Sequence, residues 1–396
     1  MKTLKPLSIV FMLLFSSTFV FGQDDKEKGN KEAFAFTDVK ILPHTSVKNQ
    51  ASSGTCWSFS GIGMLECEII RIKGDSINLS PMWVVRNIYK EKVAKYVRLH
   101  GSLNLSAGGS FADVLQASSK YGIVPAEVYE GLNYGTTSHS HSELDRIVEE
   151  FGKNIVKSRK PTTAWPRALS AILDAYLGDA PEKFVYNSKE YTPESFVKYT
   201  GLKLDDYVSI TSYTHHPFYG SFILEIPDNW IWESSYNVPM DELIQIIDNS
   251  IEKGYAVAWG SDVSERSFSR DVATIPEEKK VEEAGSDQAR WDKESAEPES
   301  KPIVEPLPNE KTITQQMRQE AFDNYETTDD HGMVIIGTAK DQNEKKYYKV
   351  KNSWGTGGKY AGFLYASLPF VQYKTMNIVV HKDAIPQNIK TKLNLK

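Results

Sequence analysis

Two short groups of residues, far apart in the chain, constrain the fold more than any other feature. Cys56 follows a polar, glycine-containing loop that begins near Gln50, and an apolar pattern with helical spacing starts at this cysteine. His331 opens an apolar stretch, and Asn352 directly follows the next such stretch. If these residues act together, the fold must bring a helix from the N-terminal part against strands from the C-terminal part.

The chemistry of these side chains gives a reason for bringing them together. A thiol, an imidazole and side-chain amides are the parts needed for nucleophilic attack on an amide bond. Cys56 at the amino end of a helix would be favoured as a thiolate, and His331 would take its proton. Asn352 would orient the imidazole, while Gln50 and the Cys56 backbone N–H would donate to the oxyanion. The pattern predicts a cysteine peptidase.

His331 is preferred among the eight histidines because two strand-like segments come after it in the chain. Residues 333–337 and 346–351 have the composition of strands and flank a polar turn, so they predict an antiparallel pair that places Asn352 beside the imidazole. The other histidines are not followed by a strand pair with a terminal amide. Trp354 would shield the hydrogen bond from water, and Trp57, next to the nucleophile, is a further supporting residue.

The composition excludes some classes of partner. The chain has 396 residues, 25% of them charged, with a formal net charge of −6. No basic cluster of the kind that binds phosphate is present, so nucleic acid is not the expected partner. Cys56 and Cys67 are the only cysteines, and on one helix they would lie about 16 Å apart along the axis. A disulfide cannot span that distance, so Cys67 is expected to be buried and Cys56 to remain a thiol.

The N-terminal segment predicts export. Lys2 and Lys5 precede an apolar run over residues 7–21, so residues 1–22 are expected to be a cleaved signal peptide. Residues 23–33 are predicted to be a disordered leader. The mature protein would be secreted or periplasmic, without stable membrane insertion because no second run of spanning length follows. The alternative is that the apolar run is retained as a membrane anchor.

The remaining residues, 34–396, predict one α+β domain of two lobes with the site in the cleft between them. Helical segments dominate the first half, and a helical insertion is expected over about 139–220. Residues 276–310 hold eleven acidic and five basic residues and predict a flexible acidic surface loop. The expected helices are 56–73, 81–97, 113–120, 142–157, 165–177 and 238–254, and the expected later strands are 255–260, 333–337, 346–351 and 376–381.

The motifs around these residues resemble those of papain-like cysteine peptidases. The resemblance rests on Gln50-x5-Cys56-Trp57, on His331 before an apolar strand, and on Asn352-Ser353-Trp354-Gly355. Further segments look more like the bleomycin hydrolase and aminopeptidase C branch than papain itself; these are Tyr121-Gly122-Ile-Val-Pro125, Glu225-Ile-Pro-Asp-Asn229 and Gly254-Tyr-Ala-Val-Ala-Trp259-Gly. The resemblance covers most of residues 40–385.

This resemblance implies a papain-like fold, in which a helical lobe with the nucleophile helix packs on an antiparallel sheet lobe. It implies peptide substrates, no metal or organic cofactor, and a hexameric ring as a possible oligomer. It also implies that Gly108 and Gly109 expose backbone that pairs with the bound peptide. In that branch the C-terminus lies in the cleft and restricts cleavage to free N-termini, whereas the tail here, residues 390–396, is basic and polar.

Aminopeptidase activity is therefore the expected function, and three alternatives stay open. A papain-like endopeptidase would have the same catalytic residues and an open cleft. A catalytically idle peptide-binding protein would keep the fold without hydrolysis. Acyl transfer to an amine would use the same thioester.

Overall fold

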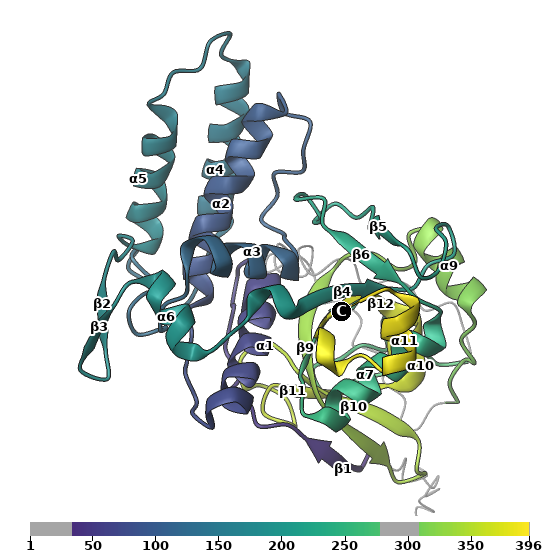
Figure 1. Cartoon of the computed structure of the whole chain (residues 1–396). Coiled ribbons are helices and arrows are strands. Elements are labelled where there is room, and N and C mark those ends of the chain that lie inside the picture. The colour runs from purple at the N-terminus through teal and green to yellow at the C-terminus, as the bar shows by residue number, and fades with distance from the viewer. Residues whose placement is uncertain (1–33, 278–308, 396) are drawn as a thin grey trace, which may run out of the picture.

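The computed structural model describes residues 34–277 and 309–395, and Figure 1 shows how their helices and strands are arranged. The helices are α1 (Cys56–Lys73), α2 (Pro81–Arg98), α3 (Phe111–Tyr121), α4 (Ser142–Lys157), α5 (Trp165–Leu177), α6 (Pro193–Thr200), α7 (Met240–Lys253), α9 (Gln315–Asp323), α10 (Leu368–Lys374) and α11 (Gln387–Lys392). The strands are β1 (Phe36–Ile41), β2 (Phe184–Tyr186), β3 (Lys189–Tyr191), β4 (Tyr207–Thr211), β5 (Ser221–Ile223), β6 (Ser234–Asn237), β7 (Val257–Ser261), β8 (Val272–Ala273), β9 (His331–Asp341), β10 (Lys346–Lys351), β11 (Phe363–Ser367) and β12 (Thr375–His381). The predicted α+β class is confirmed.

Three helices, α2, α4 and α5, lie side by side and project away from the sheet (Figure 1). Their contact faces follow the helical period: Leu144 and Val148 are buried on α4, and Leu169, Leu173 and Leu177 are buried on α5. Apolar residues four positions apart form one stripe of a helix, so each helix buries one side and leaves the other to solvent.

The main sheet contains ten strands, in the order β5-β6-β4-β12-β7-β9-β10-β11-β8, with β1 paired to β9. The expectation of an antiparallel sheet needs correction, because β4 pairs with β6 and β11 with β8 in parallel. Each parallel pair joins strands that are not consecutive in the chain. Two parallel strands start at the same end of the sheet, so the chain must run back along the sheet between them. A tight hairpin cannot do this, but the longer segments that separate these strands can.

The predicted helical insertion over about 139–220 also needs correction. It contains α4, α5 and α6, but β2 and β3 form a hairpin, and β4 belongs to the main sheet. In β4, Ile210 is fully buried and lies opposite Ile378 of β12. A core strand therefore ends the segment, and its alternating sequence is typical of strands rather than helices.

Several predicted segments lie outside the described residues, namely the signal peptide 1–22, the leader 23–33 and nearly all of the acidic loop 276–310. The ends of the acidic segment are described, and they meet. Pro276 pairs with Glu310 in a bridge, and the Glu277 N–H donates to the Asn309 carbonyl at 2.7 Å. Within the described ranges, no helix has the length and apolar character needed to cross a membrane.

Helix α1 lies between α3 and the sheet, and small residues allow this close packing. A Cβ added at Gly61 would stand 2.6 Å from the Val114 side chain of α3. At Gly63 the corresponding distance to Val334 of β9 is 3.4 Å. These two glycines let α1 pack closely against both α3 and β9. The helix that begins at Cys56 therefore lies on the strand that begins at His331.

Candidate active site

Cys56 is the first residue of α1 and is half-buried. The loop before it is held by its own polar groups: the Ser53 hydroxyl donates to the Gln50 carbonyl at 2.7 Å and lies 2.6 Å from the Thr55 hydroxyl. The Thr55 hydroxyl thus bonds to the loop rather than to the amides of the first turn. The amino end of the helix remains directed at Cys56, where it favours a thiolate.

His331 begins β9, and Asn352 follows β10 directly. The His331 Nε2 and the Asn352 Oδ1 are 2.8 Å apart, and both residues are buried, with 3% and 5% exposure. The same Oδ1 accepts from the Ser353 N–H at 2.7 Å, which fixes the direction of the amide. The Trp354 ring packs on the imidazole with a centroid separation of 4.8 Å. The predicted amide partner and the aromatic cover are therefore in place.

Ser60 links the cysteine side of the site to the histidine side. Its hydroxyl donates to the Cys56 carbonyl at 2.6 Å. A Cβ added to Gly332, the residue after His331, would lie 2.7 Å from the same hydroxyl. The absence of a side chain at Gly332 thus lets the start of β9 approach the first turn of α1, which begins with Cys56.

The side chain of Gln50 is fully buried and bonded at both ends. Its Oε1 accepts from the Ser353 hydroxyl, and its Nε2 donates to the Ser53 carbonyl at 2.9 Å. The Gln50 N–H also donates to the Ser353 carbonyl at 2.8 Å. These bonds orient the amide, and the second N–H of its NH₂ group is left for another acceptor, as an oxyanion donor requires.

Gly108 and Gly109 lie beside Trp57, whose indole N–H donates to the Ala107 carbonyl at 3.2 Å. A Cβ at Gly109 would stand 2.9 Å from the Trp57 ring, and a Cβ at Gly108 would overlap the carboxylate of Asp228. The Lys92 ammonium donates to the Gly108 carbonyl at 2.6 Å. Glycine is therefore required at both positions by packing within the protein, because Asp228 and Trp57 occupy the space that a side chain would need.

The segment 224–233, between β5 and β6, crosses from the sheet lobe to the helical lobe. The Asn104 amide donates to Asp228 Oδ1 at 3.2 Å, and the Trp230 indole donates to Asp113 Oδ2 at 3.0 Å. Asp113 is fully buried near the start of α3. The cleft is thus bridged next to the glycine pair. A small open pocket lies beside this bridge, lined by Ser110, Ala112, Ser209, Leu224, Ile226, Asn229, Glu233, Ser235, Asn377 and Val379.

Burial dominates the electrostatics of this bridge. It raises the pKa of Asp113 to about 7 and raises the pKa of Asp228. The pKa of Asp329, two residues before His331, is raised well above its usual range by burial and then by neighbouring carboxylates. Burial also lowers the pKa of Lys92, against the attraction of the carboxylates around it. One buried ammonium therefore faces several buried carboxyl groups beside the glycine pair.

Comparison with known proteins identifies the relatives of this chain. A model of the Peptidase C1-like family matches residues 20–275 and 310–396, which is most of the sequence. The chain belongs to the Peptidase C1-like family. The match is interrupted at 276–309, within the acidic segment.

Curated relatives of this Peptidase C1-like chain carry aminopeptidase names. It is 24% identical over 388 residues to aminopeptidase C of Streptococcus thermophilus, covering 86% of this chain and 81% of the relative. It is 25% identical over 391 residues to aminopeptidase G of Lactobacillus delbrueckii subsp. lactis, covering 88% and 83%. The chain is a cysteine-type peptidase, and the predicted resemblance is confirmed.

A solved structure supports the fold. The crystal structure of PepW from Lactobacillus rhamnosis matches with a TM-score of 0.66 at 22% identity, covering 90% of this chain and 84% of that one. At this identity the likeness shows the papain-like fold and nothing further.

The sequence analysis identified the motif residues of this site but missed the buried charges beside them. Gln50, His331, Asn352 and Trp354 are connected through Ser353 and the imidazole, and Ser60 links Cys56 to the start of β9. Trp57 contacts the segment of Gly108 and Gly109. A signal for Lys92 existed, since it stands on the apolar face of α2 among Tyr89, Val93 and Tyr96. A lysine in a buried stripe needs acceptors, and these are the Ser106 and Gly108 carbonyls.

Proposed function

We propose that this protein is an exported cysteine aminopeptidase that acts through Cys56, His331 and Asn352. The observation that carries the mechanism is the buried hydrogen bond between His331 Nε2 and Asn352 Oδ1, with the start of β9 packed on the first turn of α1. This bond engages Nε2, so the proton from the Cys56 thiol goes to Nδ1 of the same ring.

In the proposed reaction, the Cys56 thiolate attacks the scissile carbonyl and forms a C–S bond. The Gln50 NH₂ group and the Cys56 backbone N–H donate to the resulting oxyanion. The C–N bond then breaks, and the leaving amine takes the proton from His331. Water, deprotonated by His331, attacks the thioester, and the thiolate is released with the carboxylic acid product.

The preference for free N-termini is supported by the relatives' names and by the segment 224–233. This segment bridges the lobes beside Gly108, where an endopeptidase would need an open path for the N-terminal part of its substrate. The described tail is held elsewhere, since Lys392 donates to Tyr219 at 3.2 Å and also bonds to Glu242.

The test uses one peptide with a free N-terminus and the same peptide N-acetylated. The mature protein is expected to cleave only the free peptide, and Cys56→Ala is expected to lose this activity by about 10⁴-fold or more. Cys67→Ala is the matched control, because the Cys67 thiol is buried and burial raises its pKa to about 12. Cleavage of both peptides would instead identify an endopeptidase, and cleavage of neither would favour an idle binding protein.

Export is the second part of the proposal. It is supported by the basic residues Lys2 and Lys5 before the apolar run at 7–21. N-terminal sequencing of the protein recovered outside the cytoplasm is expected to begin at Gln23. A mature protein that retains Met1 would contradict this part and leave the catalytic part unaffected.

A further inference from the structure

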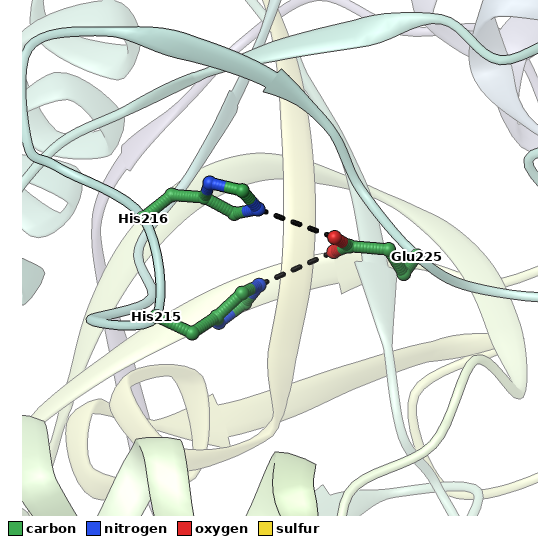
Figure 2. A group of neighbouring side chains, drawn as sticks. All are labelled: His215, His216 and Glu225. Carbon is green, nitrogen blue, oxygen red and sulfur yellow. Dashed lines mark hydrogen bonds and ion pairs between the residues drawn. The ribbon is translucent and has the colours of Figure 1, made fainter.

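Two histidines and a glutamate form a polar group distinct from the candidate active site. His215 and His216 lie in the loop after β4, and Glu225 follows β5 (Figure 2). The Nε2 atom of each ring lies 3.2 Å from a different oxygen of the Glu225 carboxylate. One potential ligand atom from each of the three residues lies within 4.8 Å of the other two. Three potential metal ligands therefore converge on one point.

The spacing suits a small divalent cation. In a tetrahedral zinc site with bonds of about 2.0 Å, neighbouring ligand atoms are about 3.3 Å apart. Each imidazole Nε2 lies at about this distance, 3.2 Å, from one oxygen of the Glu225 carboxylate, and the two rings approach different oxygens. The side chains of His215 and His216 are 26% and 38% exposed, so an ion can enter from solvent. Two imidazoles and one carboxylate leave the fourth position for water.

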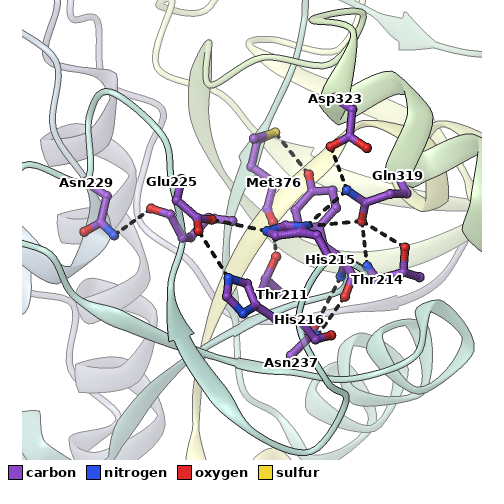
Figure 3. A network of polar contacts seen from close by, with 12 residues as sticks. Thr211, Thr214, His215, His216, Glu225, Asn229, Asn237, Gln319, Asp323 and Met376 are labelled. Carbon is purple, nitrogen blue, oxygen red and sulfur yellow. Dashed lines mark hydrogen bonds and ion pairs between the residues drawn. The ribbon is translucent and has the colours of Figure 1, made fainter.

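The ring of His215 is oriented from behind, as metal-binding histidines usually are. Its Nδ1 lies 3.1 Å from Gln319 Nε2 and 3.3 Å from Gln319 Oε1 on α9 (Figure 3). The Gln319 amide is itself held, because its Oε1 accepts from the Thr214 N–H at 2.6 Å and its Nε2 donates to Asp323 at 2.8 Å. Metal binding needs the proton on Nδ1, where it can donate to Gln319 Oε1, so that the Nε2 lone pair faces an ion instead of Nε2–H donating to Glu225.

The loop that carries both histidines is also fixed. The Asn237 amide donates to the carbonyls of Tyr213 at 2.8 Å and His216 at 2.9 Å. The His216 ring stacks on Phe222 at a centroid distance of 4.2 Å, and the His215 ring stacks on Phe322 at 5.5 Å. The loss of side-chain and loop entropy that usually opposes metal binding is therefore small here, because both histidines are already held in place.

We propose that His215, His216 and Glu225 bind one divalent transition-metal ion, with zinc as the best-fitting type, outside the active site. The ion joins the loop after β4 to the segment after β5. That segment continues to Asp228, which lies against Gly108, and Gln319 belongs to the helix that precedes His331. The metal is a structural brace for the bridge between the lobes and takes no part in the reaction.

The test uses the full mature chain carrying Cys56→Ala, so that the catalytic thiol cannot bind the added metal. Titration calorimetry with zinc chloride after chelator treatment is expected to show one ion per chain. His215→Gln, His216→Gln and Glu225→Gln should each weaken binding at least about 10-fold. His100→Asn, which removes an exposed histidine from a different loop, should leave the affinity unchanged.

Two further measurements keep the test decisive if one variant fails to fold. Cobalt(II) bound to the Cys56→Ala chain should give the intense visible bands of tetrahedral coordination without a thiolate charge-transfer band. Free zinc at 100 times its dissociation constant should raise the ratio of folded to unfolded protein about 100-fold. Binding of equal strength in the His215→Gln and Glu225→Gln variants, or weak octahedral cobalt spectra, would overturn the proposal and leave a simple ion pair.

Discussion

The candidate active site and the histidine pair at 215–216 use similar parts in different surroundings. In both, an imidazole Nε2 meets a side-chain oxygen and an aromatic ring packs on the imidazole. His331 is 3% exposed and meets the neutral amide of Asn352. The side chains of His215 and His216 are 26% and 38% exposed, and they share the carboxylate of Glu225.

This difference teaches what each site can do. A buried imidazole held by a neutral amide keeps one tautomer and can accept and return a proton without a competing charge. Two exposed imidazoles facing one carboxylate provide three ligands and a negative charge, which suit a cation that arrives from solvent. Burial and the partner's charge, rather than the imidazole itself, separate proton transfer from metal binding.

The largest expected effect comes from removing the buried imidazole. His331→Gln should lower kcat for the free peptide by about 10³-fold or more, because the thiol loses its base and the leaving amine loses its acid. His215→Gln is the matched change at the exposed pair and should alter kcat less than about 2-fold. Steady-state kinetics on both variants check this. Equal losses in the two would contradict the division of roles.

Loss of the buried amide donor should have the next largest effect. Gln50→Ala should lower kcat by about 10²-fold to 10³-fold with little change in KM, since the donor acts on the oxyanion and not on the bound ground state. Ser353→Ala serves as the control, because it removes the hydroxyl that holds Gln50 Oε1 but leaves the amide donor. If Ser353→Ala were as damaging as Gln50→Ala, positioning rather than donation would explain the effect.

The sequence predicted the parts of the site that obey local rules. Helices α1, α4 and α5 have their predicted bounds because apolar periodicity and end signals agree there. His331 was placed correctly at the start of a strand, since the strand pair after it is local. The partners of Lys92 and of His215 depend on residues more than ten positions away, such as Asp228 and Gln319. No local pattern encodes such contacts, and so they required the structure.

A third histidine environment predicts a pH effect on stability. His141 is fully buried, and burial lowers its pKa from 6.5 to about 3. The unfolded chain therefore binds more protons than the folded chain below pH 6.5, so stability is lost as pH falls. Between pH 7.5 and pH 5 this histidine should cost about 2 kcal/mol of unfolding free energy. Urea unfolding at both pH values should show a flatter dependence in His141→Phe; an unchanged slope would contradict the assignment.

The smallest expected effect concerns the aromatic cover on His331. Trp354 packs on the imidazole at 4.8 Å and on Phe268 at 5.9 Å, and Arg270 donates to its carbonyl at 3.0 Å. Trp354→Leu admits water to the His331–Asn352 bond, which is stronger in a dry environment. We expect kcat to fall about 10-fold, equivalent to about 1.4 kcal/mol.

A control and a double variant make this last prediction specific. Trp165→Leu removes a tryptophan from the start of α5 and should leave kcat unchanged. If Trp354 acts by shielding the bond, its removal should matter much less once Asn352→Ala has already broken that bond, so the two changes should not add. Additive losses would mean that Trp354 only packs against its neighbours. The orientation of His331 would then depend on Asn352 alone. The difference between His331 and the pair of His215 and His216 would come from the charge of Glu225 and not from the exclusion of water.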